Sequence, residues 1–275
     1  METIGKVIDL GKAMRSGKSK IFSRMPGFLI RLLEKLVHQD DMNYTIHRSR
    51  HLDGIPFIND VLDGWKVDVI IKGSENLPPE GRFIFVANHP VGAIDALSFF
   101  SATGKYYKDI VSPSNELLNY IPNLRSLMLG INVFGKNSRE TAQKLNELFD
   151  SNTQVLIFPA GEVSRRRKGV ISDPLWQKTF VTKAIQSRRD IVPVHISGRN
   201  SELFYRVANL RTFLGIKMYL ETILLPGEMM SQRGRPVTVT FGKPVSYTTL
   251  TPDKTHQEWA LEIRKIVYSM IGDKQ

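Results

Sequence analysis

The chain has 275 residues, enough for one large domain with a buried core, and its 41% hydrophobic and 24% charged residues are typical of a globular protein. Lysine and arginine number 38 against 27 aspartates and glutamates, a formal net charge of +11, which favours anionic partners such as lipid headgroups, phosphorylated molecules or nucleic acid. Cysteine is absent, which excludes disulfides, thiolate metal sites and a cysteine nucleophile.

The N-terminal part of the chain differs in composition from the rest. We predict two units, a basic and amphipathic helical region over residues 1–64 and an α/β domain over residues 65–275. Between Lys12 and Arg31 there are six basic residues and no acidic one, and residues 28–37 then carry apolar side chains at helical spacing. Such a helix either lies in a membrane interface, with its basic residues on anionic headgroups, or packs on its own domain.

Membrane-crossing segments are not predicted. No stretch approaches the ~20 apolar residues that cross a bilayer, and the first twenty residues lack the apolar centre of a secretory signal peptide. We therefore expect no transmembrane helix and no signal peptide, and a peripheral protein on the cytoplasmic face of a membrane.

From residue 65 onward, short apolar runs alternate with longer helical patterns. This alternation predicts an α/β domain with a mostly parallel central sheet flanked by helices. We predict strands at residues 67–71, 83–87, 131–134, 155–158, 191–196 and 237–241. We predict helices at residues 95–103, 115–128 with a break at Pro122, 139–150, 175–188 and 253–271. Because sites in such sheets collect at the carboxyl ends of strands, the segments that follow the strands are the candidates.

A histidine and an aspartate follow the predicted strand at residues 83–87, in the sequence Asn-His-Pro-Val-Gly-Ala-Ile-Asp that ends at Asp95. Pro90 and Gly92 shape a turn between them. A carboxylate that holds one imidazole nitrogen lets the other nitrogen accept a proton, so His89 and Asp95 are a candidate general base and its orienting group. The alternative is a helix-capping aspartate beside an incidental surface histidine.

The sequence offers no protein nucleophile for such a base. No Gly-x-Ser-x-Gly motif occurs, and cysteine is absent. A base at His89 would therefore act on a hydroxyl that the substrate brings.

A basic segment follows the predicted strand at residues 155–158. It begins Phe-Pro-Ala-Gly-Glu-Val-Ser and ends in the basic run at residues 165–168, which either binds an anion through two-point arginine contacts or forms a solvated loop. The residues that we predict to contact substrate here are Phe158, Pro159, Gly161, Glu162, Ser164 and Arg165.

A further basic patch follows the predicted strand at residues 131–134. Lys136 and Arg139 lie where a helix opens, and the amides and dipole of a helix start favour an anion there. The alternative is ordinary helix-start chemistry. No Gly-x-x-x-x-Gly-Lys-Ser/Thr motif is present, so a nucleotide P-loop is excluded.

Four segments, taken in order, resemble the blocks of the glycerolipid acyltransferase superfamily, of the lysophosphatidic acid acyltransferase type. They are the His-to-Asp turn, the Gly-rich basic segment at residues 130–139, Phe-Pro-x-Gly at residues 158–161 and Ile-Val-Pro-Val at residues 191–194. The resemblance covers about residues 67–245, and the combination in order is more specific than any one block. It favours the catalytic interpretation of His89.

Two departures from that pattern resemble a bacterial hemolysin-like branch, whose members are similar to ornithine- and glycine-lipid O-acyltransferases. Five residues instead of four separate His89 from Asp95, and Gly92 is the residue that can take up the extra one. Ala160 stands where glutamate is expected, and residues 197–205 also resemble this branch.

The resemblance implies an O-acyltransferase that moves a fatty acyl group from an acyl carrier protein or coenzyme A thioester to the hydroxyl of a lysolipid. The acceptor would be a lyso-aminolipid, such as lyso-glycine or lyso-ornithine lipid, or 1-acylglycerol-3-phosphate. His89 would deprotonate the hydroxyl with Asp95 behind it, and Lys136, Arg139 and Arg165 would bind the headgroup. The thioester is a co-substrate, no cofactor or metal is implied, and a membrane surface is the expected partner.

Two other classes of protein stay open. The charge and the arginine run are compatible with a nucleic-acid-binding module, but no helix-turn-helix, zinc or RNA-binding signature is present, and we expect no nucleic-acid partner. The second class is a noncatalytic lipid-binding protein with an idle histidine. Measured turnover distinguishes it from an enzyme.

Overall fold

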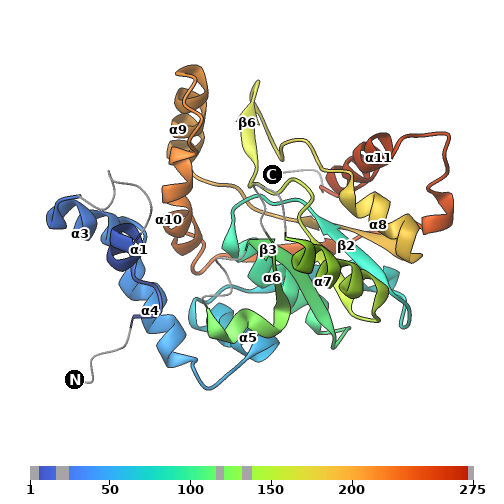
Figure 1. Cartoon of the computed structure of the whole chain (residues 1–275), viewed down its shortest axis with the longest axis horizontal. Coiled ribbons are helices and arrows are strands. Elements are labelled where there is room, and N and C mark those ends of the chain that lie inside the picture. The colour runs from blue at the N-terminus through green and yellow to red at the C-terminus, as the bar shows by residue number, and fades with distance from the viewer. Residues whose placement is uncertain (1–5, 17–24, 116–120, 132–137, 272–275) are drawn as a thin grey trace.

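The structure is a computed structural model that describes residues 6–16, 25–115, 121–131 and 138–271. A central sheet carries helices on both faces (Figure 1), which confirms the predicted α/β class. The strands are β1 (Val69–Lys72), β2 (Phe83–Ala87), β3 (Ile110–Asn115), β4 (Met128–Ile131), β5 (Gln154–Ile157), β6 (Arg165–Arg167), β7 (Val170–Ser172), β8 (Asp190–Ile196) and β9 (Val237–Phe241). The α-helices are α1 (Leu10–Ser16), α3 (Gly27–Leu36), α4 (Gln39–Arg48), α5 (Gly54–Gly64), α6 (Ala93–Gly104), α7 (Arg139–Asp150), α8 (Thr179–Ser187), α9 (Glu202–Phe213), α10 (Leu225–Met230) and α11 (His256–Ser269). Short 3₁₀ turns are η1 (Ser74–Asn76), η3 (Pro122–Leu127), η4 (Leu220–Leu224) and η5 (Tyr247–Thr249).

Seven of the described strands form the central sheet, in the order β1-β9-β8-β2-β5-β3-β4. Strands β8, β2, β5, β3 and β4 run parallel, whereas β9 pairs antiparallel with β8 and parallel with β1. The prediction of a mostly parallel sheet is confirmed. Strand β2 lies in the middle of the order, so the residues after it emerge at the centre of the carboxyl edge.

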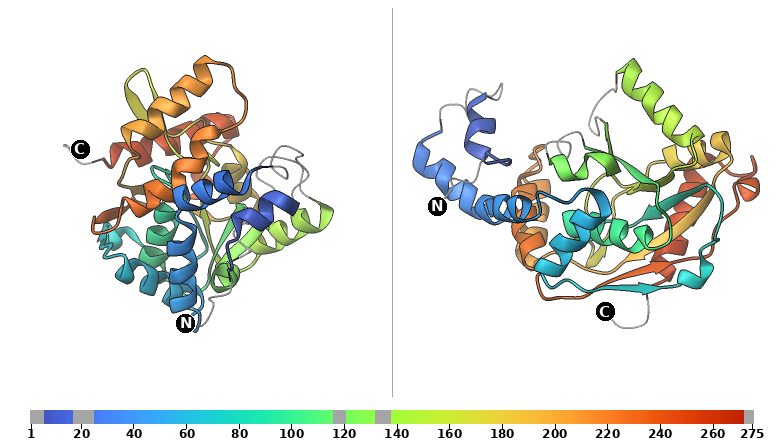
Figure 2. Two further views of the ribbon diagram at one scale, coloured as in Figure 1. Left: turned by 90° about the vertical axis from the view of Figure 1, so that its left-hand side faces the viewer. Right: turned by 90° about the horizontal axis from the view of Figure 1, so that it is seen from below.

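The core has two layers, one on each face of the sheet, and β2 contributes side chains to both. Phe83 and Phe85 belong to an apolar cluster with α5 and α6, whereas Ile84 and Val86 belong to a second cluster with α7, α8 and α11. Alternate side chains of a strand point to opposite faces, so this division places one helical layer on each side of the sheet. Figure 2 shows the helices around the sheet from two further directions. A run of five buried apolar residues is typical of a central parallel strand.

Most predicted elements are confirmed, and β2, α7 and β9 have the predicted bounds. The helix predicted at residues 115–128 is wrong. Strand β3 ends at Asn115, a 3₁₀ turn occupies residues 122–127, and β4 begins at Met128. Pro122 starts that turn, where its missing amide leaves no helical hydrogen bond unmade. The described apolar residues of this stretch therefore belong to a turn and to the start of the edge strand β4.

Other elements were partly or wholly missed by the sequence analysis. Of the strand predicted at residues 131–134, Ile131 ends β4 and the other residues lie outside the described ones. Strand β3, helices α9 and α10 and the hairpin of β6 and β7 were not predicted, and α1, α4 and α5 lie in the region that was predicted as helical without individual bounds. Helix α9 buries Phe204 and Tyr205 but exposes Leu203 and Leu210, so no single apolar stripe marks it in the sequence.

The N-terminal helices are fastened to one another by buried amide side chains. Oδ1 of Asn43 in α4 accepts hydrogen bonds from the amides of Val7 and Ile8, both at 2.9 Å. Oε1 of Gln39 accepts from the amide of Leu10 at 2.7 Å. Helix α5 packs in the same apolar cluster as β2, and the division at residue 64 stays a prediction. Within the described part of the chain, every helix is too short or too polar to cross a bilayer.

At the amino edge of the sheet, Arg189 is fully buried directly before β8. Burial lowers the pKa of Arg189 to about 10, so the guanidinium still carries its charge at neutral pH. It donates hydrogen bonds to backbone carbonyls that come from β2, the end of α7 and the turn before β5. The acceptors are the carbonyl oxygens of Phe83, Leu148, Phe149, Ser151 and Thr153. One side chain thus holds together three segments at this edge.

Candidate active site

The structure brings the predicted histidine and aspartate into contact. His89 follows the carboxyl end of β2, and Asp95 lies in the first turn of α6. Nδ1 of His89 lies 2.9 Å from Oδ2 of Asp95. The His89 side chain is 19% exposed and that of Asp95 is 0% exposed. The imidazole is therefore open on one side and is held from behind by a carboxylate that water does not reach.

The backbone of the turn holds the Asp95 carboxylate in place. Oδ2 also accepts hydrogen bonds from the amides of Val91 at 2.8 Å and Gly92 at 2.9 Å. Burial raises the pKa of the Asp95 carboxyl, and the hydrogen bonds from His89 and from the two amides oppose that rise. Oδ1 is buried without a hydrogen-bond partner among the described residues. Asp95 therefore caps the helix and holds the histidine ring at once, so the histidine is not an incidental neighbour of a capping residue.

The turn between the two residues depends on a glycine and on two asparagines. Gly92 has a φ of 142°, a conformation that other residues rarely adopt. This conformation lets His89 and Asp95 meet although five residues separate them. The side chain of Asn88 bonds the carbonyl and the amide of Ile196 at 2.9 Å and 2.7 Å. Nδ2 of Asn200 donates to the carbonyl of Pro90 at 3.3 Å. The segment after β8 thus supports the histidine turn.

The segment after β5 supplies a flat apolar neighbour for the imidazole. The ring of Phe158 stacks on that of His89, with centroids 4.2 Å apart and planes at 21°. Gly161 has a φ of 66°, and its amide donates to the carbonyl of Phe158 at 3.0 Å. The carbonyl of Pro159 accepts from the amide of Gln177 at 2.9 Å. The predicted residues Phe158, Pro159 and Gly161 therefore form a tight turn beside His89.

A buried aspartate that the sequence analysis missed joins the two segments. The Asp173 carboxylate accepts from the amide of His89 at 3.1 Å and 3.2 Å, from Oγ of Ser164 at 2.6 Å and from Nε1 of Trp176 at 2.9 Å. The amide of Ser164 also donates to the carbonyl of His89 at 2.7 Å. The only local signal for Asp173 is an Asp-Pro pair, which also marks ordinary turns.

Glu162 and Arg165, in the same segment, each contact a side chain from residues 219–221. Nη2 of Arg165 lies 3.0 Å from Oε1 of the fully buried Glu221, which also pairs with Arg211 at 2.8 Å. Oε1 of Glu162 accepts from the hydroxyl of Tyr219 at 2.9 Å. Arg165 is itself buried, so it is not part of a solvated loop.

Of the two predicted headgroup-binding residues near residue 138, the structure describes Arg139 alone. Arg139 is the exposed first residue of α7, after Ser138, whose Oγ accepts from the amide of Thr141 at 3.1 Å. Lys136 lies outside the described residues. Strands β5 and β3 separate β4 from β2, which at the usual strand spacing is about 14 Å from the histidine strand to the strand before α7.

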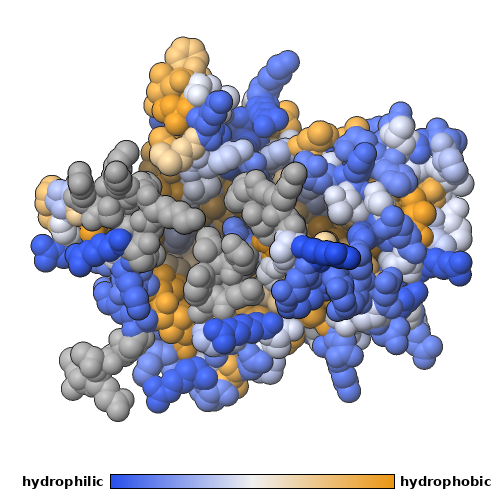
Figure 3. All heavy atoms as spheres, viewed as in Figure 1, coloured by the Kyte–Doolittle hydropathy of each residue, from blue (hydrophilic) through white to orange (hydrophobic). Residues whose placement is uncertain are grey.

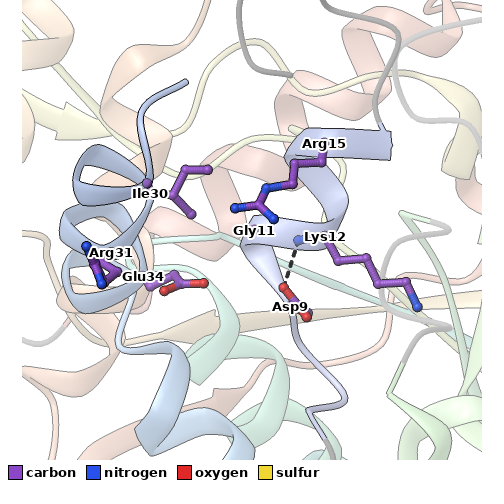
Figure 4. Close-up of a pocket in the computed structure, with 8 residues that line it drawn as sticks. Asp9, Gly11, Lys12, Arg15, Ile30, Arg31 and Glu34 are labelled. Carbon is purple, nitrogen blue, oxygen red and sulfur yellow. Dashed lines mark hydrogen bonds between the residues drawn. The ribbon is translucent and has the colours of Figure 1, made fainter. Parts of the chain in front are cut away.

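A hollow of about 760 Å³ lies between α1 and α3, and His89 is not part of its lining. Lys12, Arg15 and Arg31 line it together with Asp9 and Glu34 (Figure 4). The described basic residues of the N-terminal stretch therefore line a charged depression between α1 and α3. Within the described ranges, no group of three histidine, aspartate or glutamate side chains is placed to hold a metal ion.

A histidine with one nitrogen fixed by a carboxylate, at the carboxyl end of a central parallel strand, is an arrangement typical of enzymes that use a general base. The chain belongs to the acyltransferase family, whose model matches residues 14–273. The prediction of an acyltransferase is therefore confirmed, as is the resemblance that led to it.

Two curated relatives match nearly the whole chain. The chain is 39% identical to the lyso-glycine lipid O-acyltransferase of Bacteroides thetaiotaomicron, over 96% of this chain and 97% of that protein. It is 37% identical to the lyso-glycine lipid O-acyltransferase of Phocaeicola vulgatus, over 96% and 95%. Among solved structures, the 1-acyl-sn-glycerophosphate acyltransferase of Thermotoga maritima matches with a TM-score of 0.46 at 18% identity, over 89% of this chain and 97% of that one.

Proposed function

We propose that the protein transfers a fatty acyl group from an acyl thioester to the hydroxyl of a lysolipid, and that the acceptor is a lyso-glycine lipid. The acceptor is supported by the two relatives, which match over nearly their full length. The observation that carries the chemistry is the 2.9 Å contact between Nδ1 of His89 and Oδ2 of Asp95. It leaves Nε2 of the imidazole as the nitrogen that receives a proton.

In the proposed reaction, Nε2 of His89 takes the proton of the acceptor hydroxyl while that oxygen attacks the thioester carbonyl. The tetrahedral intermediate collapses, the carbon–sulfur bond breaks, and the imidazolium returns its proton to the leaving thiolate. Asp95 stabilises the positive charge that His89 carries between the two proton transfers. The acyl donor is the thioester of an acyl carrier protein or of coenzyme A, and the chain uses no further cofactor.

The proposed binding residues have different parts in this reaction. Phe158 holds the plane of the imidazole, and Pro159 and Gly161 shape the turn that presents Phe158. Ser164 acts through Asp173 on the histidine backbone. Glu162 and Arg165 support the same wall of the site through Tyr219 and Glu221, and Lys136 and Arg139 are left to attract the anionic donor or headgroup.

We also propose that the protein works at an anionic membrane surface on the cytoplasmic side, reached through residues 12–37. The charged hollow between α1 and α3 supports this proposal, because Lys12, Arg15 and Arg31 are among its lining residues, beside an amphipathic helix. A protein that lacks residues 12–37 but still pellets fully with anionic vesicles would refute this part.

The experiment that tests the function is an acyl transfer assay with the purified full chain, an acyl carrier protein thioester and two acceptors offered in competition. These are lyso-glycine lipid and 1-acylglycerol-3-phosphate, and diacyl products are identified by mass spectrometry. We expect diacylated glycine lipid as the main product, and its formation to depend on His89. Preference for 1-acylglycerol-3-phosphate would overturn the acceptor, and absence of both products would overturn the function.

The same preparation decides between the alternatives. Binding of lysolipid without turnover would favour a noncatalytic lipid-binding protein. A salt-dependent gel shift at nanomolar concentration, without turnover, would favour nucleic-acid binding.

A further inference from the structure

Helix α9 exposes an apolar face where a surface helix is ordinarily polar. Five apolar residues of α9 and of the segment that follows it are each more than half exposed, and Phe213 is 86% exposed. We call these five residues the α9 ridge: Leu203, Leu210, Phe213, Leu214 and Met218. Spacings of seven and four residues along the helix put Leu203, Leu210 and Leu214 on one side of it. The opposite side packs on the protein through the buried Phe204 and Tyr205.

The α9 ridge stands clear of the body of the protein. Helix α9 projects above α10 at the top of Figure 1, and Figure 3 shows apolar residues gathered on the same projection. A monomer in water does not keep such a face without a partner, because each large apolar side chain costs free energy when it is solvated.

The α9 ridge continues into the outer face of α3. Phe28, Leu32 and Leu36 recur every four residues on α3 and are exposed by 64%, 61% and 41%. A groove of about 430 Å³ joins the two helices, with Leu32 and Leu36 on one wall and Leu203 and Leu224 on the other. The two stripes therefore form one apolar face that reaches from the N-terminal helices to the end of α9.

Basic residues border this face. Arg199, Arg206 and Lys217 are exposed around the α9 ridge, whereas Glu202 is engaged by Arg166 in a two-point ion pair. Such an arrangement, apolar in the centre and cationic at the border, is complementary to the acyl chains and anionic headgroups of a lipid surface. A second copy of the chain would bring the same positive border against this one, so a symmetric dimer through this face is disfavoured.

We propose that the α9 ridge is a second membrane-docking element, which inserts into the interface of an anionic bilayer together with α3. The inference rests on the proposed function, because a lysolipid acceptor has to be collected from a membrane. Leu225, which follows the groove residue Leu224, lies against the turn at Gly92 beside the catalytic histidine. Docking through this face would therefore bring the bilayer surface close to the turn that carries His89.

The test is vesicle partition of the full chain, which needs no turnover. We compare the wild type with the double variant Phe213→Ser/Leu214→Ser on vesicles of phosphatidylcholine with phosphatidylglycerol. The matched control is Ile70→Ser/Ile266→Ser, which removes two exposed apolar side chains from β1 and α11. We expect the ridge variant to lower the partition coefficient about tenfold, as loss of several buried methylene equivalents implies, and the control to leave it unchanged.

The other readouts separate this inference from the proposed function. Activity of the ridge variant on acceptor dispersed in detergent micelles should equal that of the wild type, because the ridge does not contact the histidine. Loss of partition in a protein that shows no acyl transfer would support the docking face and overturn the function instead. Unchanged partition of the ridge variant would overturn the inference, and so would a lipid-free dimer that the ridge variant dissociates.

Discussion

Two fully buried charged groups, Asp95 and Arg189, lie at opposite edges of the same sheet, and their surroundings differ. Arg189 at the amino edge donates to five backbone carbonyls, so its charge is met on all sides by protein. Asp95 at the carboxyl edge receives its three hydrogen bonds on Oδ2 alone, and Oδ1 has none among the described residues. We expect the fully satisfied charge to stabilise the fold, and the partly unsatisfied charge beside an accessible histidine to serve the proposed acyl transfer.

The comparison predicts that Arg189→Met damages stability and spares the chemistry. Several carbonyls would lose their donor inside the protein, which should lower the free energy of unfolding by about 3 kcal/mol or more. We expect the activity of the remaining folded protein to be unchanged. Chemical denaturation and the rate per folded molecule check the two parts.

Arg82→Met is the matched control for that variant. Arg82 is only half-buried and donates to two carbonyls, those of Asp150 and Ser187. Its loss should cost about 1 kcal/mol. An equal loss of stability in both variants would contradict the prediction that Arg189 stabilises the fold more than Arg82 does.

At the carboxyl edge of the sheet, Asp95→Asn should lower the activity and leave the stability intact. The amide still accepts from the turn but cannot stabilise an imidazolium, so acyl transfer should fall about 100-fold or more, because the carboxylate behind a general-base histidine fixes its tautomer and supports its charge. The free energy of unfolding at neutral pH should not fall, because a buried charge has been removed. A variant that is unstable yet fully active would break the comparison.

The residue that joins the two site segments can sharpen the comparison. Asp173→Ala should lower kcat about tenfold beyond the loss of folded protein, because the backbone of His89 loses its anchor. KM for the thioester should change little. Trp176→Phe is the control, since it removes one donor to Asp173 without touching the histidine, and it should lower stability alone.

The smallest expected effect is a pH dependence of stability. Burial raises the pKa of Asp95, so the folded state holds this proton more tightly than the unfolded state does, and the stability that results is present at low pH and lost as pH rises through the folded pKa. The Asp95→Asn variant lacks this term. Its advantage in unfolding free energy over the wild type should therefore shrink as pH falls from 7 towards 4, and an advantage that grows would contradict the assignment.

The elements that the sequence predicted are those whose signal is local. Five consecutive apolar residues mark β2, and the histidine and aspartate follow it within one turn, so the pair is visible in a single segment. Their contact also requires that Gly92 adopt its unusual φ.

The elements that the sequence did not predict depend on distant partners. Asp173 meets His89 across 84 positions of the chain, and the carbonyl acceptors of Arg189 come from three other segments. The basic run at residues 165–168 was compatible with an anion site or a solvated loop, and no local pattern indicated that Glu221, more than fifty positions further on, pairs with Arg165. Local patterns do not report which charges the fold brings together.

The central claim, that the imidazole of His89 is the base, is tested most directly by the rate of acyl transfer of His89→Ala with lyso-glycine lipid, at equal concentrations of folded protein. The account predicts a rate about 100- to 10,000-fold lower than that of the wild type, with the free energy of unfolding nearly unchanged. A rate within a factor of about two of the wild type would contradict it, since general-base catalysis of this kind contributes more than that.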